Sequence, residues 1–450
     1  MLYKWLHKIS PTRIIALSFI LVILCGTVLL CLPLSSRTGQ WTHPLDALFT
    51  STSATCVTGL IIADTYTNWS LFGQLVILVM IQIGGIGLMT VISMIFIFMK
   101  RKLSMQERML LMQAAGNVQV AGMVKLIKRI LAGTAIIESF GAILLAIRFI
   151  PKMGFGQGLY YAVFHSVSAF CNAGFDLMGK YEPYSSFTAY QDDWLVNLTL
   201  AALIILGGIG FLVWEDILKN KCKFSKYSLH SKLILITAGI LLLLGTIGFF
   251  IFESNFTMKG DAVPERILKS FFASTTMRTA GFNTIDYSQM SPSAILLSDA
   301  LMMIGGSPGS TAGGIKTTTI AVIFIAMISM SRGNSDITIF KKRLGKDLVK
   351  QAAVIVVVYL TYVILGTMLI CHIEAINNIR LSSAQFEVIS AACTVGVTMG
   401  ITPHLSALSH VILIILMYGG RIGGFSLMLV FGELNKKPPL KRPKEKVLIG

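Results

Sequence analysis

The chain has 450 residues, of which 54% are hydrophobic and only 13% are charged. A soluble domain usually carries about 25% charged residues, so this chain has too little polar surface to cover a water-soluble globule of its size. The composition argues against a soluble enzyme, a nucleic-acid-binding protein and a disordered scaffold. It favours a protein that crosses a bilayer core of roughly 30 Å several times.

Eight long apolar segments recur along the chain. Each pair of them encloses a short stretch rich in Ser, Thr, Phe and Gly, which is too short to cross a membrane. We therefore expect each pair to form a span, a short re-entrant element and a second span. The predicted spans are residues 14–32, 71–99, 123–150, 194–218, 233–252, 294–330, 352–371 and 408–431.

The four short elements align without gaps and define an internal repeat. Each begins with Phe and ends with Gly, and the residue six places before the Gly is Ser53, Ser168, Thr275 or Ser390. The glycines are 115, 107 and 115 residues apart. A fixed period of this kind indicates a repeated architecture. The predicted units are 1–110, 111–230, 231–345 and 346–435, followed by a basic tail, 436–450.

Because each unit holds two spans, an even number, all four units have the same orientation in the membrane. Repeats of this kind are related by an axis along the membrane normal. We therefore expect an all-α membrane protein with eight transmembrane helices in a pseudo-fourfold arrangement around a central pore. Duplication without a pore is the alternative, but a packing unit does not need a polar, non-spanning segment in every copy.

The charge distribution predicts the orientation. The termini and the segments between units hold 27 Lys and Arg but seven Asp and Glu, whereas the opposite side holds eight basic and 14 acidic residues. By the positive-inside rule, both termini and the joining loops are cytoplasmic, and the short elements enter from outside. The net charge of +17 therefore reflects topology and contact with anionic lipid, and it gives no reason to expect a nucleic-acid partner.

Irregular backbone at membrane depth is tolerated only where it is buried in protein or lines a water-filled path. The first part of each short element is expected to be a half-helix whose C-terminal end favours a cation. The next residues would run extended, with carbonyl oxygens that replace the hydration shell of an ion. The expected ion-binding residues are Val57, Thr58, Gly59, Asn172, Ala173, Gly174, Thr279, Ala280, Gly281, Thr394, Val395 and Gly396.

The second span of the third unit contains the sequence Gly305-Gly-Ser-Pro-Gly-Ser-Thr-Ala-Gly-Gly314, followed by Ile315 and Lys316. One Pro and five Gly in ten residues do not hold an uninterrupted helix. We expect the span to break there into a polar loop, 305–316. A nucleotide-binding loop is the competing interpretation, but Ile315 separates Gly314 from Lys316 and puts the Lys out of register.

Three basic residues fall at membrane depth, where a charge is costly unless it is paired or hydrated. For Arg421, pairing with Glu433 or with a lipid headgroup is one way to meet this requirement. Arg278 is expected to donate to carbonyls or to a nearby acid, and Lys316 to brace the loop. The Gly-rich stretches 84–87 and 207–210 indicate close helix packing or a kink.

Together these motifs resemble the Trk/Ktr/HKT superfamily of potassium transporters. The resemblance covers nearly the whole chain and includes Cys171-Asn-Ala-Gly-Phe175, Arg278-Thr-Ala-Gly-Phe-Asn283 and Thr394-Val-Gly-Val-Thr-Met-Gly400. Eight spans make the chain similar to the Ktr membrane subunit. The resemblance implies an intramembrane gate formed by Gly305, Gly306, Ser307, Gly309, Ser310, Thr311, Ala312, Gly313, Gly314 and Lys316. It also implies that Arg421 lies beneath the ion-binding residues, near this loop or at a subunit contact, where it would repel cations or bond carbonyls of the loop.

The resemblance also implies a homodimer in the cell membrane that rests on a cytoplasmic ring of nucleotide-binding regulatory subunits. Gly59 at the first filter position argues by analogy for potassium uptake, and sodium coupling is left open. A sodium or non-selective cation transporter of the same fold, or a secondary transporter of another substrate, are the alternatives. Neither a catalytic pair nor metal-ligand spacing of Cys or His is evident, so we do not expect an enzyme.

Overall fold

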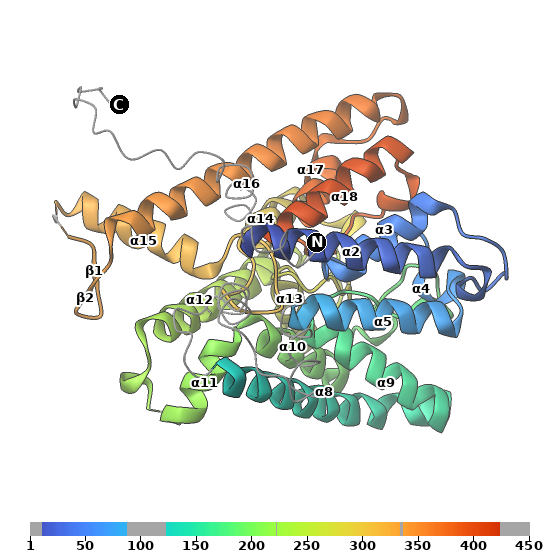
Figure 1. Cartoon of the computed structure of the whole chain (residues 1–450), viewed down its shortest axis with the longest axis horizontal. Helices are drawn as coiled ribbons and strands as arrows, with labels where there is room; N and C mark the ends of the chain where they lie inside the picture. The colour runs from blue at the N-terminus through green and yellow to red at the C-terminus, as the bar shows by residue number, and fades with distance from the viewer. Residues whose placement is uncertain (1–10, 88–122, 222, 334–335, 424–450) are drawn as a thin grey trace, which may run out of the picture.

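The computed structural model describes residues 11–87, 123–221, 223–333 and 336–423. Their regular secondary structure is almost entirely helical (Figure 1). Within the described ranges, strands occur as one two-residue hairpin, in which β1 (Thr338–Ile339) pairs antiparallel with β2 (Lys342–Arg343). The expected all-α class is therefore confirmed.

Four helices of the described ranges are long and apolar enough to cross a membrane. Each falls where the first span of a unit is predicted. Their outward faces carry exposed apolar side chains such as Leu21, Ile136 and Leu243, which are 63%, 68% and 64% exposed. Such faces suit lipid and not water. The four are α2 (Pro11–Cys31), α8 (Met123–Met153), α12 (Leu229–Phe252) and α16 (Lys346–Ile373).

Four short helices lie between the long ones and the second spans, and their last turns are buried. Each packs against the long helix that precedes it. They occupy the first part of the predicted re-entrant elements and extend toward the N-terminus beyond it. The four are α3 (Pro44–Thr55), α9 (Phe155–Phe170), α13 (Val263–Thr276) and α17 (Leu381–Ala392).

The second spans differ most from the prediction. The helices found there have 10 to 16 residues, and α10 is bent by 95° relative to α11. The predicted span over 194–218 is therefore divided into two helices, because Gly210, with φ of 93°, redirects the chain within the stretch where a kink is one of the two expectations. The helices are α5 (Leu71–Ile86), α10 (Trp194–Gly208), α11 (Phe211–Asn220), α14 (Pro292–Met303), α15 (Thr317–Ser331) and α18 (Ala407–Ile422).

In the predicted third unit, α14 ends at Met303 and α15 begins at Thr317, so the helix is interrupted over the stretch that contains the 305–316 loop. The ends of the predicted spans 71–99 and 408–431 lie outside the described residues. The predicted basic tail, 436–450, and Glu433 lie outside the described residues as well.

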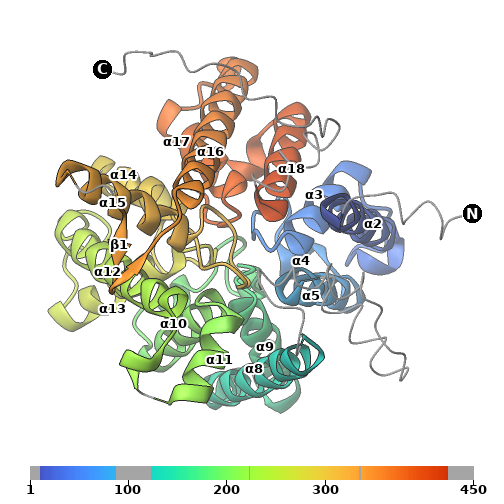
Figure 2. The same ribbon diagram turned by 60° about the vertical axis from the view of Figure 1, so that its left-hand side comes forward.

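In the third and fourth units, the start of the second helix is held by the residue that caps the long helix before it. Glu253 accepts a hydrogen bond from the backbone N–H of Ser291 at 2.9 Å, at the start of α14. Glu374 accepts from the N–H of Ser406 at 2.8 Å, at the start of α18. These contacts join the two helices within each of these two units. Figure 2 shows the helices of the four predicted units as clusters, in chain order around a common centre.

Candidate ion-selective site

The four short helices end with the same unusual backbone geometry. The residue two places before each glycine has a left-handed conformation, which non-glycine residues rarely adopt. The same strained position in four separate segments indicates that the surrounding structure imposes it. These residues are Val57, Asn172, Thr279 and Thr394, with φ of 57°, 58°, 65° and 52°, and the glycines themselves have φ of 98°, 71°, 84° and 93°.

The glycines of the four segments meet carbonyl groups of their neighbours. A methyl group added at Gly59 would lie 2.6 Å from the carbonyl oxygen of Ala173, and one at Gly174 would lie 2.9 Å from that of Ala280. One added at Gly281 would lie 2.9 Å from the oxygen of Val395.

The fourth contact closes the cycle, because a methyl group at Gly396 would overlap the carbonyl oxygen of Thr58. Each segment therefore touches the next, and the last touches the first. All twelve predicted ion-binding residues are buried in this ring. The structure thus brings together residues that are separated by more than a hundred positions in the sequence.

Side-chain hydroxyls hold the ring, and this bracing was not predicted from the sequence. The Oγ atoms of Ser53 and Ser390 accept hydrogen bonds from the N–H groups of Gly59 and Gly396, at 3.1 and 3.0 Å. Ser168 Oγ donates instead to the carbonyl oxygen of Phe175 at 2.7 Å. The alignment of four copies with a hydroxyl at one position was the signal for these braces.

The third unit departs from that alignment. Its brace comes from Thr276, whose Oγ1 donates to the carbonyl oxygen of Phe282 at 2.7 Å. Thr275 Oγ1 instead donates within its own helix, to the oxygen of Phe271 at 2.8 Å. The correspondence of Thr275 with the three serines is therefore wrong in terms of contacts. The reason is that α13 ends five residues before its glycine, whereas the other three short helices end four residues before theirs.

The 305–316 loop lies against the bend between α10 and α11. Ser307 donates its N–H to the carbonyl oxygen of Gly208 at 3.0 Å, and Phe211 donates to that of Gly309 at 2.9 Å. Within the loop, Ser310 Oγ donates to the oxygen of Ser307 at 2.7 Å. The Gly-rich stretch 207–210 is therefore a kink onto which the loop docks.

The loop also touches the ring. Thr311 Oγ1 donates toward the carbonyl oxygen of Phe170 at 3.2 Å and the side-chain oxygen of Asn172 at 3.3 Å. A methyl group at Gly313 would overlap Thr394 Oγ1. Within the described residues the loop thus reaches the second and fourth segments of the ring. The predicted gate residues and the predicted ion-binding residues form one continuous site.

Two of the three basic residues at membrane depth hold this loop. Arg421 Nη1 donates to the carbonyl oxygen of Thr311 at 2.5 Å, and its Nη2 donates to that of Gly84. Lys316 Nζ donates to the oxygens of Ala312 and Gly313 at 2.7 and 3.3 Å. Both expected sets of carbonyl contacts are present. Carbonyl oxygens are the partners that make a charge tolerable at this depth.

The third basic residue, Arg278, lacks such carbonyl partners among the described residues. Its side chain has no hydrogen bond or ion pair with any residue in the described part of the chain, so the expected bracing is not found there. The residue is 8% exposed and lines a cavity of about 10 Å³ together with Ile204, Ile205, Gly208, Thr275 and Gly306. That volume is enough for about one water molecule.

An acidic residue at membrane depth was also missed. Glu138 lies in the middle of α8, and both of its carboxylate oxygens accept from Gln82 Nε2 at 3.1 Å. Gln82 Oε1 in turn accepts from Cys171 Sγ at 3.4 Å, three residues before Gly174. Glu138 is therefore connected through Gln82 to the start of the second ring segment, and it does not lie among the acidic residues of the predicted outer side. The position of Glu138 in the middle of the predicted span 123–150 was the available signal.

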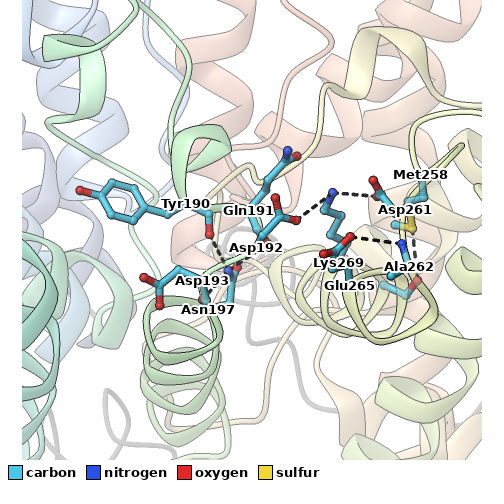
Figure 3. Close-up of polar contacts among 11 residues, drawn as sticks. Tyr190, Gln191, Asp192, Asp193, Asn197, Met258, Asp261, Ala262, Glu265 and Lys269 are labelled. Carbon is cyan, nitrogen blue, oxygen red and sulfur yellow. Dashed lines mark hydrogen bonds and ion pairs between the residues drawn. The ribbon is translucent and has the colours of Figure 1, made fainter.

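The ends of α10 and α13 that are remote from the loop are joined by an ion-pair bridge. Lys269, which is 3% exposed, lies 2.7 Å from Asp261 and 3.1 Å from Asp192 (Figure 3). The neighbouring Asp193 caps α10 and pairs with Arg148 at 3.2 Å. Asp192 and Asp193, two acidic residues of the predicted outer side, thus fix the positions of helices.

The chain matches the TrkH family of cation transport proteins over residues 9–438. It belongs to this family. The potassium/sodium uptake protein NtpJ of Enterococcus hirae is 40% identical over 449 residues, covering 98% of this chain and 98% of that protein. The Ktr system potassium uptake protein B of Bacillus subtilis is 37% identical over 452 residues, covering 99% and 98%.

The fold agrees with this assignment. The crystal structure of the potassium transporter TrkH from Vibrio parahaemolyticus superposes with a TM-score of 0.71, at 17% identity, over 93% of this chain and 85% of that one. The resemblance drawn from the sequence motifs is therefore confirmed. The members of the family named here are ion transporters and not enzymes.

Proposed function

We propose that this member of the cation transport family takes up potassium through a pore on the axis of its four units. One observation carries the proposal: the closed ring in which each glycine meets a carbonyl group of the next segment. Relatives named for potassium uptake support the choice of ion. The membrane potential would draw the cation inward along this path.

In this proposal the ring is the selectivity filter. Its three positions per unit would replace the hydration shell of the ion with carbonyl oxygens. The C-terminal ends of α3, α9, α13 and α17 would add their partial negative charges below it. The residues are Val57, Thr58, Gly59, Asn172, Ala173, Gly174, Thr279, Ala280, Gly281, Thr394, Val395 and Gly396.

The 305–316 loop is proposed as the gate. Its contacts with Asn172 and Thr394 support this role, because they place the loop against the ring, where it would close the path. Arg421 and Lys316 would hold the loop in its closed position through its carbonyl oxygens. Opening would require the loop to leave the bend at Gly207–Gly210.

The same proposal includes eight membrane crossings in four units, 1–110, 111–230, 231–345 and 346–435, with a cytoplasmic tail at 436–450. The four long helices and the clusters around one centre support it. The distribution of Lys and Arg supports a cell-membrane protein with cytoplasmic termini. A homodimer on a ring of nucleotide-binding regulatory subunits is proposed from the similarity to the Ktr protein alone.

Rubidium uptake into cells that lack their own potassium systems tests the function. Expression of the chain should restore uptake, and Gly281→Asp should abolish it. Uptake of sodium and rubidium at equal rates by the wild-type chain would favour the alternative, a sodium or non-selective transporter of the same fold. An unaltered preference for potassium in both Gly59→Asp and Gly281→Asp would contradict the filter assignment.

A further inference from the structure

We infer that the hydroxyl group of Thr311 couples the loop to the ring, so that the position of the loop sets the ion preference as well as the flux. This inference rests on the proposed function. It assigns Thr311 as a positioning residue that acts on the ion through Asn172.

The contact is buried and specific. Thr311 is fully buried and Asn172 is 1% exposed. The Thr311 hydroxyl lies 3.3 Å from the Asn172 side-chain oxygen and 3.2 Å from the carbonyl oxygen of Phe170, the last residue of α9. One hydroxyl of the loop therefore touches both the end of a short helix and the first residue of the ring segment that follows it.

The four ring residues two places before the glycines differ in their side-chain contacts with the loop. Val57 offers no polar side chain, and the hydroxyls of Thr279 and Thr394 have no partner among the described residues. Within that part of the chain, Asn172 is the ring residue that receives a side-chain hydrogen bond from the 305–316 loop. The loop is therefore coupled to the ring through the second unit.

The backbone of Thr311 makes this contact dependent on the rest of the loop. Its N–H donates to the carbonyl oxygen of Gly207 at 3.3 Å, and its own oxygen accepts from Arg421. Movement of the loop would break both bonds together with the bond to Asn172. Buried acceptors left without donors are costly until water replaces the lost partner. The docked position of the loop and the orientation of the Asn172 side chain are thus coupled.

The backbone conformation of Asn172 explains why its contact with Thr311 affects ion selectivity. Its φ of 58° places it in the left-handed region, so the orientation of the adjoining peptide groups is strained and depends on support. Removal of the Thr311 hydroxyl would allow the Asn172 side chain to rotate and the carbonyl ring to relax. A relaxed ring discriminates less between ions of different size.

The test compares Thr311→Val, Thr311→Ser and a control, Thr317→Val, in purified protein reconstituted into liposomes. Thr317 Oγ1 lies 3.2 Å from Ser307 Oγ, so the control removes a hydroxyl contact within the loop region that does not involve the ring. The readout is the ratio of rubidium to sodium uptake. We expect Thr311→Val to lower this ratio by about threefold to tenfold, the effect of one hydrogen bond, while Thr311→Ser and Thr317→Val retain it.

A double substitution adds a second readout. Asn172→Ala should lower the ratio, and adding Thr311→Val to it should cause little further change, because the two act through one contact. An unchanged ratio in a monodisperse Thr311→Val protein, or fully additive effects, would overturn the inference. A wild-type protein without any preference for rubidium would instead contradict the proposed function.

Discussion

The guanidinium group of Arg421 donates a hydrogen bond to the carbonyl oxygen of Thr311 at 2.5 Å. The two residues belong to different units, since Arg421 lies in the last turn of α18 and Thr311 in the loop between α14 and α15. The second arm of the same guanidinium donates to Gly84 of α5. One charged side chain therefore fastens the loop to the first and fourth units.

Arg421→Gln should release the loop partly, because an amide donates more weakly than a guanidinium and lacks its fork geometry. We expect rubidium uptake into proteoliposomes to rise several-fold. Arg332→Gln serves as the control, since Arg332 is exposed after the end of α15. Unchanged or lower uptake by a well-folded Arg421→Gln protein would argue against a holding role.

Deletion of residues 309–313 should raise rubidium uptake more than Arg421→Gln does. The deletion removes the carbonyl of Gly309 that accepts from Phe211, the Thr311 contacts and the packing of Gly313 on Thr394. The path beneath the ring would then lack its obstruction. Equal or reduced transport by a variant with normal expression and monodispersity would count against the loop as a gate.

Gly281→Ala should reduce the ratio of potassium to sodium uptake by at least about tenfold. The added methyl group would lie 2.9 Å from both the oxygen of Val395 and the Cα atom of Gly174, and φ is 84° there. The strain falls on the ring itself. Gly239→Ala is the matched control, because nothing lies within 4 Å of an added methyl group at that position. A wild-type ratio in Gly281→Ala would show that the ring is not the selective element.

The sequence predicts those parts of this fold that arise from local pattern. Apolar runs locate the four long helices, and the spaced glycines locate the ring segments, because each signal lies within one unit. The Gly-rich stretch 207–210 leaves close packing and a kink as alternatives, and the contact between Thr311 and Asn172 depends on neighbours from other units. The latter residues are 139 positions apart, and nothing in either local sequence specifies the partner.

The brace from Thr276 was missed for a related reason. A gapless alignment assumes that every helix ends at the same distance from its glycine, and α13 does not. The role of Arg278 was likewise not predictable from spacing, because its surroundings include Gly208 and Gly306 from two other segments. Contacts between units, and not local propensity, set these details.

Lys269→Met should lower the temperature of thermal unfolding in detergent by several degrees. The substitution keeps most of the apolar stem but leaves Asp261 and Asp192 without their buried partner (Figure 3). Asp192→Asn should have a smaller effect, because Asp192 is 51% exposed and water can replace the lost partner. Equal unfolding temperatures for wild type and Lys269→Met would contradict a stabilising bridge.

Glu374→Gln should destabilise the protein at neutral pH but not in strong acid. Burial alone would raise the pKa of Glu374, but hydrogen bonds from Ser406, Ser409 and Asn377 outweigh it and lower the pKa to about 2. An unfolded Glu has a pKa of about 4.3. A depressed pKa contributes stability that is present above the unfolded value and is lost as pH falls toward the folded one.

The difference in unfolding temperature between wild type and Glu374→Gln should therefore be constant from pH 7 to about 5 and shrink between about pH 4 and 2. The expected stabilisation at neutral pH is about 1.5–3 kcal/mol, the range for hydrogen bonds to a charged group. Asp347→Asn is the control, since that side chain is 92% exposed and should give no such difference. A difference that persists undiminished to pH 3 would mean that shape, and not the ionised carboxylate, holds α16 to the start of α18.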